Sequence, residues 1–144
     1  MTMFGKLRQA GIELSNGAVE FFWKGVTAYP QVPANADVEA HAATDTIVAA
    51  DFGKNNTNTG ASGTTVHTLP APGPYKGKSI RFQATAAQIM QITPPTAVGI
   101  YLGGSGVATK YLNIAAVIGN YADLYSNGTH YLVTGYAGVL TKEA

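Results

Sequence analysis

The sequence predicts an all-β protein, an antiparallel β-sandwich or small jelly-roll-like barrel that follows an extended N-terminal arm. Short β-branched and aromatic runs recur from residue 46 onward, separated by turn residues, at spacings typical of sandwiches and barrels. Residues 78–85 are the clearest case, because Ile80, Phe82 and Ala84 alternate with polar side chains. Alternation with period two indicates a half-buried strand.

The first 44 residues lack the regular strand-and-turn pattern of the rest of the sequence and are predicted to form the arm. Tyr29-Pro30-Gln31-Val32-Pro33 is a stiff connector, since each proline fixes φ and biases the residue before it to an extended conformation. A segment of this size can hardly bury a core of its own. We therefore expect an arm over residues 1–44 and a β-sandwich oligomerisation domain over residues 45–144.

Within the domain, the runs of β-branched and aromatic residues predict six strands before the final hairpin. The expected strands cover residues 47–52, 64–69, 78–85, 88–93, 98–102 and 111–117. The segment 45–70 joins the first two through a Gly/Asn/Thr-rich connector that carries no catalytic side chain, so its role is expected to be architectural. Residues 70–74 contain three prolines and a glycine and should form a turn.

A hairpin is predicted over residues 121–134, because Asn127-Gly128 is a preferred pair for a two-residue type I′ turn. That turn sets Leu124 opposite Tyr131 and Ala122 opposite Val133, and these four side chains should enter the core. The opposite side of the ribbon should face solvent or another subunit. It carries Asp123, Tyr125, His130 and Thr134.

Composition excludes several classes of protein and favours self-association. Charged residues make up only 12% of the chain, about half the usual share, so much of the surface must be neutral. A neutral surface is poorly protected against association, which favours a homo-oligomer over a monomer. There is no cysteine for disulfides or thiolate metal sites, and a net charge of +1 without a basic stripe argues against nucleic acid. Without a secretory signal or a long apolar run, we expect no membrane partner and synthesis in a cytoplasm.

Three groupings contain residue types found at chemical sites, but none predicts one within a single chain, and no cofactor is expected. Asp123, Ser126 and His130 are the residue types of a hydrolytic triad, but the predicted register puts Ser126 and His130 on opposite faces. Residues 37, 39 and 41 (Asp, Glu, His) alternate, yet the outer two lie about 13 Å apart in a strand and cannot share a metal ion within one chain. This leaves open only a site on a symmetry axis, with one residue from each of three chains. Residues 103–106 are glycine-rich without a phosphate-binding signature and should form a hairpin turn.

The eight tyrosines favour an interface or core over a sugar-stacking platform. Tyrosine suits half-buried strands and is enriched where subunits meet. The candidate subunit-interface residues are Tyr121, Tyr125, His130 and Tyr136.

Two parts of the domain resemble a known family. Ala49-Ala50-Asp51, the run at 58–63 (Asn-Thr-Gly-Ala-Ser-Gly) and Thr68-Leu69-Pro70 resemble the capsid decoration (cement) proteins and head fibres of tailed bacteriophages. The closing strand, turn and aromatic strand around Asn127-Gly128-Thr129 resemble the same family. The chain has Asn127 where Asp is frequent in that family and Tyr131 where Trp is frequent.

The resemblance implies a viral structural protein without enzymatic activity. It would bind the major capsid protein on the outer surface of the virion, as a trimer, and stabilise the shell. The candidate capsid-binding residues are Phe4, Leu7, Phe21, Phe22 and Trp23, because an arm on a surface has no other use for so many apolar side chains. The alternative is a phage fibre or receptor-binding module that recognises host surface glycans.

Overall fold

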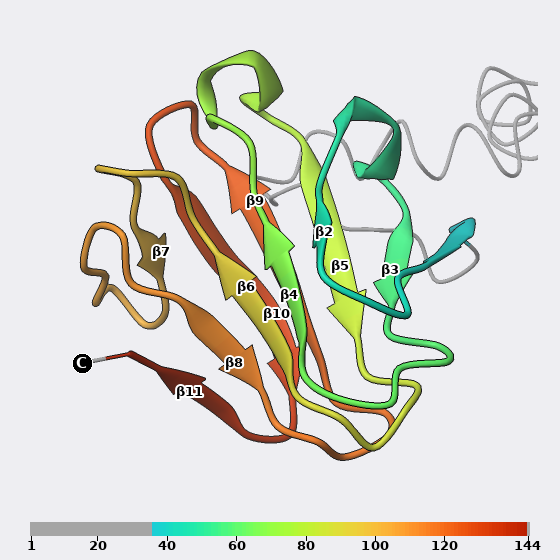
Figure 1. Ribbon diagram of the computed structural model, residues 1–144. Helices are drawn as coiled ribbons and strands as arrows, with labels where there is room; N and C mark the ends of the chain where they lie inside the picture. Colours follow the sequence, from blue (N-terminus) through green and yellow to red (C-terminus); the bar gives the residue numbers. More distant parts are fainter. Residues whose placement is uncertain (1–35, 144) are drawn as a thin grey trace, which may run out of the picture.

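The computed structural model describes residues 36–143, which form two mixed β-sheets (Figure 1). The first sheet has the strand order β1-β3-β5-β9-β10-β7 and the second has β11-β8-β6-β4-β2. The strands of the first sheet are β1 (Val38–Ala40), β3 (Asn55–Thr57), β5 (Ser79–Gln83), β7 (Ile100–Tyr101), β9 (Tyr121–Ser126) and β10 (Tyr131–Ala137). Those of the second are β2 (Asp45–Thr46), β4 (Thr65–Thr68), β6 (Met90–Thr93), β8 (Leu112–Ile114) and β11 (Leu140–Lys142).

The chain winds between the two sheets as it runs from β1 to β6. Odd-numbered strands join the first sheet and even-numbered strands join the second, so strands that follow each other in sequence do not pair. Each return to a sheet brings the chain back in the same direction. The neighbours β1–β3, β3–β5, β2–β4 and β4–β6 are therefore parallel, as is β7–β10.

The mostly β prediction is confirmed, but the antiparallel prediction is only partly right. Among the strands of the described residues, the antiparallel pairs are β5–β9, β9–β10, β6–β8 and β8–β11. The prediction assumed that consecutive strands are joined by hairpins, whereas most connections here cross to the other sheet. Neither sheet closes into a barrel.

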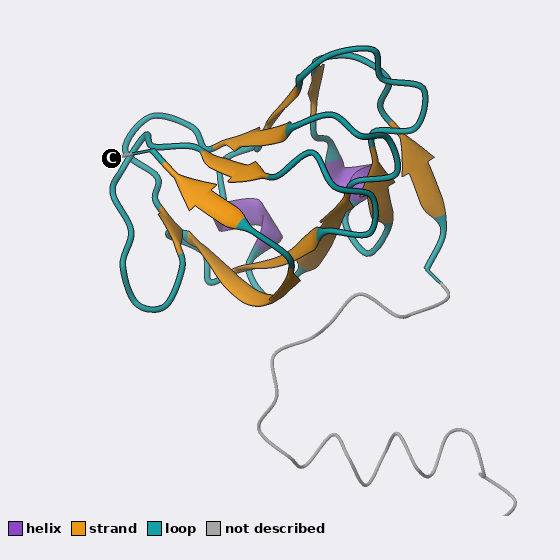
Figure 2. Ribbon diagram, turned by 90° about the horizontal axis from the view of Figure 1, so that it is seen from below, coloured by secondary structure: helices purple, strands orange, loops and turns teal. Residues whose placement is uncertain are grey.

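The hydrophobic core lies between the two sheets, which face each other in Figure 2. Ile80 and Phe82 enter it from β5, and Met90 and Ile92 enter it from β6, as the period-two pattern of those strands requires. Burial of each such side chain is worth roughly 1.5 to 3 kcal/mol. Tyr131 is also fully buried, and its hydroxyl donates to the carbonyl of Pro70 at 2.9 Å.

The strand predicted over residues 47–52 is wrong. β2 ends at Thr46, and Ala49–Asp51 forms a 3-10 turn in which the Asp51 carboxylate accepts the Val48 N–H at 2.8 Å. A second 3-10 turn, Gly73–Tyr75, lies in the proline-rich segment predicted to turn. Strand β3 occupies the Asn-rich connector instead, where asparagine has low β propensity and the sequence gives little signal.

Asn58 follows β3 and shows how this connector builds the fold. Its side chain is fully buried, and its Oδ1 accepts the backbone N–H groups of Thr85 and Ala86 at 2.8 and 2.9 Å. Its Nδ2 donates to the carbonyls of Ala86 and Gln88 at 3.3 and 3.0 Å. One amide therefore supplies the hydrogen bonds that the loop between β5 and β6 lacks.

The other five predicted strands coincide with β4, β5, β6, β7 and β8, each of which is shorter than expected. β1, β2, β3 and β11 were not predicted. β1 lies before the expected boundary at residue 45 and pairs with β3, so the first sheet includes residues of the expected arm. The capsid-binding candidates Phe4, Leu7, Phe21, Phe22 and Trp23 lie outside the described residues.

The hairpin of β9 and β10 has a register that differs from the predicted one. Ser126 pairs with Tyr131, and Leu124 pairs with Val133, because the Asn127 side chain accepts the N–H groups of Thr129 and His130. Of the predicted type I′ pair, only the glycine has a positive φ. The shift is by two residues, so the same side chains still face the core.

Residues 103–106, the glycine-rich segment, form a type I′ turn, the type that was expected at Asn127-Gly128. Gly103 and Gly104 have φ angles of 59° and 80°, and Leu102 and Ser105 exchange backbone hydrogen bonds of 3.0 and 3.2 Å on either side. Positive φ at both central residues is the mark of a type I′ turn. The prediction of a hairpin turn at residues 103–106 is confirmed.

Candidate functional site

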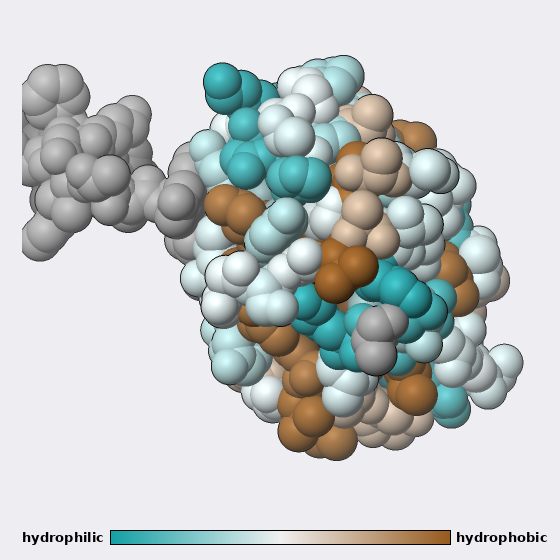
Figure 3. Space-filling view, turned by 90° about the vertical axis from the view of Figure 1, so that its left-hand side faces the viewer, coloured by the Kyte–Doolittle hydropathy of each residue, from teal (hydrophilic) through white to brown (hydrophobic). Residues whose placement is uncertain are grey.

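Apolar side chains are exposed together at one end of the fold, on the β8–β9 loop, the end of β10 and the β10–β11 turn. Val117 and Ile118 are 58% and 66% exposed, and Tyr136 and Val139 are 54% and 60% exposed. We call these four residues the apolar tip. Figure 3 shows apolar surface gathered at the lower end of the molecule. Consecutive exposed apolar residues in a loop are unfavourable for an isolated protein and mark a contact surface.

Backbone hydrogen bonds hold the tip in one shape. The N–H of Ala115 donates to Val139 at 3.1 Å and so joins the loop to the turn, and the N–H of Gly119 donates to Ala84 at 2.8 Å. Asn120 is buried beneath the tip, and its Nδ2 donates to the Ala115 carbonyl at 3.4 Å. A surface fixed in advance loses little conformational entropy when a partner binds.

Gly138 is the residue that lets the two segments of the tip approach each other. Its φ is +82°, and a Cβ at this position would lie 1.9 Å from the Oδ1 of Asn120. No other residue fits without displacing the Asn120 side chain. The position therefore requires glycine for both its conformation and its space.

A buried ion pair lies on the outer face of the first sheet, between the neighbouring strands β5 and β9. The guanidinium of Arg81 donates to both carboxylate oxygens of Asp123 at 2.7 Å, and it lies 4.4 Å from the centre of the Tyr121 ring. The hydrogen bond to Asp123 raises the pKa of Arg81. Asp123 was expected to face solvent or another subunit, but it is almost fully buried. The sequence could not reveal its partner, because the two residues meet only through the register of the sheet.

The predicted interface residues occupy three different places. Tyr121 and Tyr125 lie on the outer face of β9, half-buried. His130 precedes β10, where its Nδ1 accepts the Gly99 N–H at 3.0 Å and its ring lies 5.1 Å from that of Tyr101. Tyr136 belongs to the apolar tip, because a bulge between Val133 and Gly135 sets it opposite Ala122.

The suspected triad residues do not meet. Ser126 donates its hydroxyl hydrogen to the Pro72 carbonyl at 2.8 Å, while Asp123 and His130 have the partners described above. Glu39, from the alternating acidic row, pairs with Lys54 at 2.8 Å. Among residues 36–143, no group of three or more His, Cys, Asp or Glu side chains could hold a metal ion.

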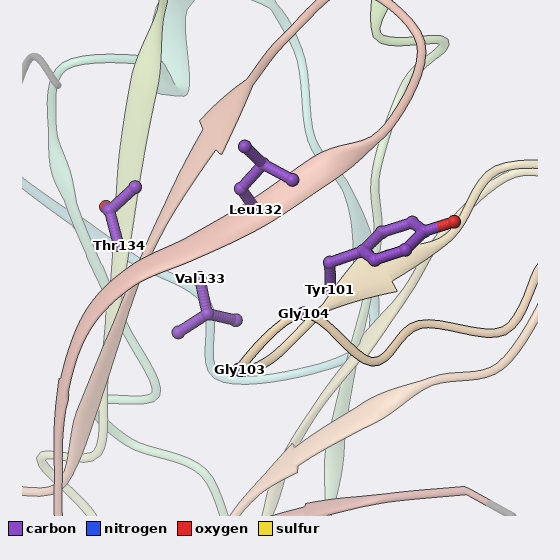
Figure 4. A pocket seen from close by; sticks show the side chains of 6 residues that line it. All are labelled: Tyr101, Gly103, Gly104, Leu132, Val133 and Thr134. Carbon is purple, nitrogen blue, oxygen red and sulfur yellow. The ribbon is translucent and has the colours of Figure 1, made fainter.

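A shallow hollow of about 400 Å³ lies between β10 and the turn at Gly103 and Gly104 (Figure 4). It is lined by Tyr101, Gly103, Gly104, Leu132, Val133 and Thr134. The Tyr101 ring packs against Gly106, where a Cβ would lie 2.6 Å from the ring. Of the tyrosines considered for a sugar platform, Tyr101 alone lines this hollow.

Two histidines form a buried cluster where the chain first crosses between the sheets. The rings of His41 and His67 lie 5.2 Å apart. His67 Nε2 is 2.9 Å from the Thr65 hydroxyl, and its Nδ1 has no hydrogen-bond partner. Burial, and then the nearby His41, lower the pKa of His67 to about 4. Sequence inspection missed His67, because a polar residue at a core position gives no signal apart from the strand's period.

The chain matches no protein-family model and no curated protein. Within residues 36–143 there is no helix long and apolar enough to cross a bilayer.

We expect Gly138→Ala to lower the free energy of unfolding by roughly 3 kcal/mol, since it adds left-handed strain and a clash that displaces Asn120. Gly53→Ala is the matched control, because Gly53 has a φ of +81° but no atom within 4 Å of the added Cβ. The control should cost about 1 kcal/mol. Urea unfolding measures both, and equal losses would contradict the close packing at the tip.

We also expect the fold to lose stability in acid through His67. Its pKa is 6.5 when unfolded and about 4 when folded, so the unfolded chain binds more protons between these values. The free energy of unfolding should fall by up to about 3 kcal/mol as the pH drops through this window. Urea unfolding at pH 7 and pH 4.5 should show a smaller difference for His67→Gln. An unchanged difference would assign the acid sensitivity to other groups.

Proposed function

We propose that this protein is a bacteriophage capsid decoration protein, a β-sandwich that assembles with copies of itself and binds the outer surface of the major capsid protein shell. The observation that carries the proposal is the apolar tip, which is exposed, rigid and free of charge. Such a surface suits permanent burial between subunits. The family resemblance at residues 49–51, 58–63 and 68–70 supplies the viral context.

The surroundings of the tip support contact between identical subunits. The segments 84–89, 115–122 and 136–139 contain no charged residue. Identical patches can therefore meet around a symmetry axis without like charges facing each other. We propose a homotrimer, the state that the resemblance implies, with Tyr136 in the contact.

The N-terminal segment would then supply attachment to the shell. Phe4, Leu7, Phe21, Phe22 and Trp23 each offer roughly 1.5 to 3 kcal/mol on burial. In a trimer, docking of one segment brings the other two to about millimolar effective concentration. Binding to the assembled shell and not to free capsid subunits stabilises that shell by mass action.

The hollow beside Tyr101 supports a second candidate, a fibre or receptor-binding module for host glycans. An aromatic ring at the side of a shallow hollow is a common element of sugar sites. Binding of the isolated protein to a glycan array, together with no affinity for shells, would favour this candidate.

Ile118→Lys should reduce the oligomer to monomer, because it places three like charges at the proposed axis. Native mass spectrometry measures the result. Val107→Lys is the control, since Val107 is 50% exposed and lies outside the tip. If both variants keep the mass of the wild type, the tip is not the subunit contact.

Trp23→Ala should abolish binding to shells, because it removes the largest apolar side chain of the attachment segment. Cosedimentation with purified shells of the virus that encodes the chain measures occupancy. Native mass and circular dichroism should stay unchanged, which separates lost attachment from lost folding. Wild-type occupancy in this variant would refute the assignment of the segment.

A further inference from the structure

His41 lies at the corner where the chain leaves β1 and crosses toward β2. It is 5% exposed, and its backbone N–H donates to the Thr57 carbonyl at 2.8 Å. The chain that precedes β1 is the segment to which shell attachment is assigned above. Contacts of His41 therefore bear directly on how firmly that segment is joined to the two sheets.

Both ring nitrogens of His41 face oxygen atoms. Nδ1 is 2.8 Å from Oδ2 of Asp45, and Nε2 is 2.9 Å from Oδ1 of Asn56. The orientation of the Asn56 amide is fixed, because its Nδ2 donates to the carbonyls of Asp51 at 3.1 Å and Arg81 at 3.3 Å. Its oxygen must then point at His41. An ionised carboxylate and an amide oxygen are both acceptors, so each can bond to the ring only through a hydrogen that the ring carries.

A neutral imidazole has one N–H and can satisfy only one of these two oxygens. With the second hydrogen on the ring, both contacts become charge-assisted hydrogen bonds. With that hydrogen lost, a ring lone pair faces the Asp45 carboxylate or the Asn56 oxygen at hydrogen-bonding distance. The geometry therefore favours the ring that carries both hydrogens over the ring that carries one.

We propose that His41 is a proton-dependent clasp that fastens β1 and the β1–β2 corner to the two sheets when its ring carries both hydrogens. Loss of one hydrogen opens the Asp45 contact and loosens β1, the edge strand through which the N-terminal segment joins the fold. The clasp itself stands on the geometry alone. Its consequence for shell attachment rests on the proposed function.

The charges around the ring are arranged in favour of this state. On β1, Glu39 is paired with Lys54, which precedes β3. On β2, the hydrogen bond to His41 is the main cause of a lowered pKa for Asp45. From β4, His67 faces His41 and is kept neutral by burial. Asp51, in the 3-10 turn, is bonded to Val48 N–H and accepts no hydrogen from the ring.

Asp45→Asn provides a matched variant. In the wild type, Oδ1 of Asp45 accepts the Thr46 N–H at 2.7 Å while Oδ2 faces His41. An asparagine can keep the first bond with its oxygen and turn its NH₂ toward His41. It can then donate to the Nδ1 of a neutral ring, whose Nε2–H still reaches Asn56. The variant should hold the corner closed without the extra proton.

The test is NMR on the full chain between pH 5 and pH 9. With three histidines in the sequence, the imidazole ¹⁵N shifts can be assigned to His41, His67 and His130. Hydrogen-exchange protection, corrected for intrinsic rates, is followed at the amides of His41 and Asn55, which bond to Thr57 and Asp37. The amide of Ala84, bonded to Asn120, reports on the rest of the fold.

In the wild type we expect His41 to carry hydrogen on both nitrogens at pH 6. Above the pH where one is lost, protection at His41 and Asn55 should fall about tenfold per pH unit, the slope for one linked proton. Ala84 should keep its protection. In Asp45→Asn, protection at all three amides should be independent of pH between pH 7 and pH 9, above the range in which His67 affects stability.

A ring with one hydrogen at pH 6, or superimposable curves for wild type and Asp45→Asn, would overturn the clasp. Shell occupancy is measured separately at pH 6 and pH 9. If the NMR result holds and no shell binding occurs at either pH, the clasp is real and the proposed function is wrong. If the protein binds shells but the NMR result fails, the proposed function stands and the clasp is wrong.

Discussion

Hydrogen bonds from two buried asparagine side chains, Asn56 and Asn58, hold the strand order of this fold. Because the chain crosses between the sheets, strands that are adjacent in one sheet are separated in sequence by long connections. Many backbone groups in these connections have no strand beside them to supply hydrogen bonds. Asn56 bonds to carbonyls before β3 and on β5, and Asn58 bonds to four backbone groups of the loop that follows β5. A buried amide without partners costs several kcal/mol, so arrangements of the chain that leave these two side chains unpaired are disfavoured.

The surface, like the core, has few unpaired charges in the regions described above. On the outer face of the first sheet, the buried carboxylate of Asp123 is neutralised by the partly exposed guanidinium of Arg81, and the apolar tip is built from uncharged segments. What remains exposed there is apolar and rigid. A protein with these properties is suited to permanent contacts with other proteins, and this is the physical basis of the proposed role on a viral shell.

Sequence reasoning succeeded where a strand's own side chains decide the outcome. Alternation over Ile80, Phe82 and Ala84 placed β5 and its core face correctly, and the glycine-rich turn at residues 103–106 was predicted from composition. It failed where the outcome depends on a distant partner. β3 is stabilised by strands on both sides in spite of its Asn-Asn-Thr sequence, and the burial of Asp123 depends on Arg81 across the sheet.

Of the four residues of the apolar tip, sequence reasoning singled out only Tyr136, and it missed the other three for a related reason. Val117 was the last residue of the strand predicted over residues 111–117, in which Leu112 and Ile114 do alternate toward the core. The run Ala116-Val117-Ile118 has no polar residue in alternate positions, and that break in period was the available signal.

The winding of β1 to β6 also bears on how the chain reaches its native state. No strand in this half can pair with the next one along the chain, so the first parallel contacts, such as Val38 with Asn55 and Thr65 with Met90, each close a loop of many residues. The entropy cost of closing each loop must be met before the strands gain free energy from pairing. Topologies dominated by such non-local contacts fold in milliseconds to seconds and not in microseconds. During synthesis, β1 would therefore stay unpaired until β3 has emerged, and β2 until β4 has emerged.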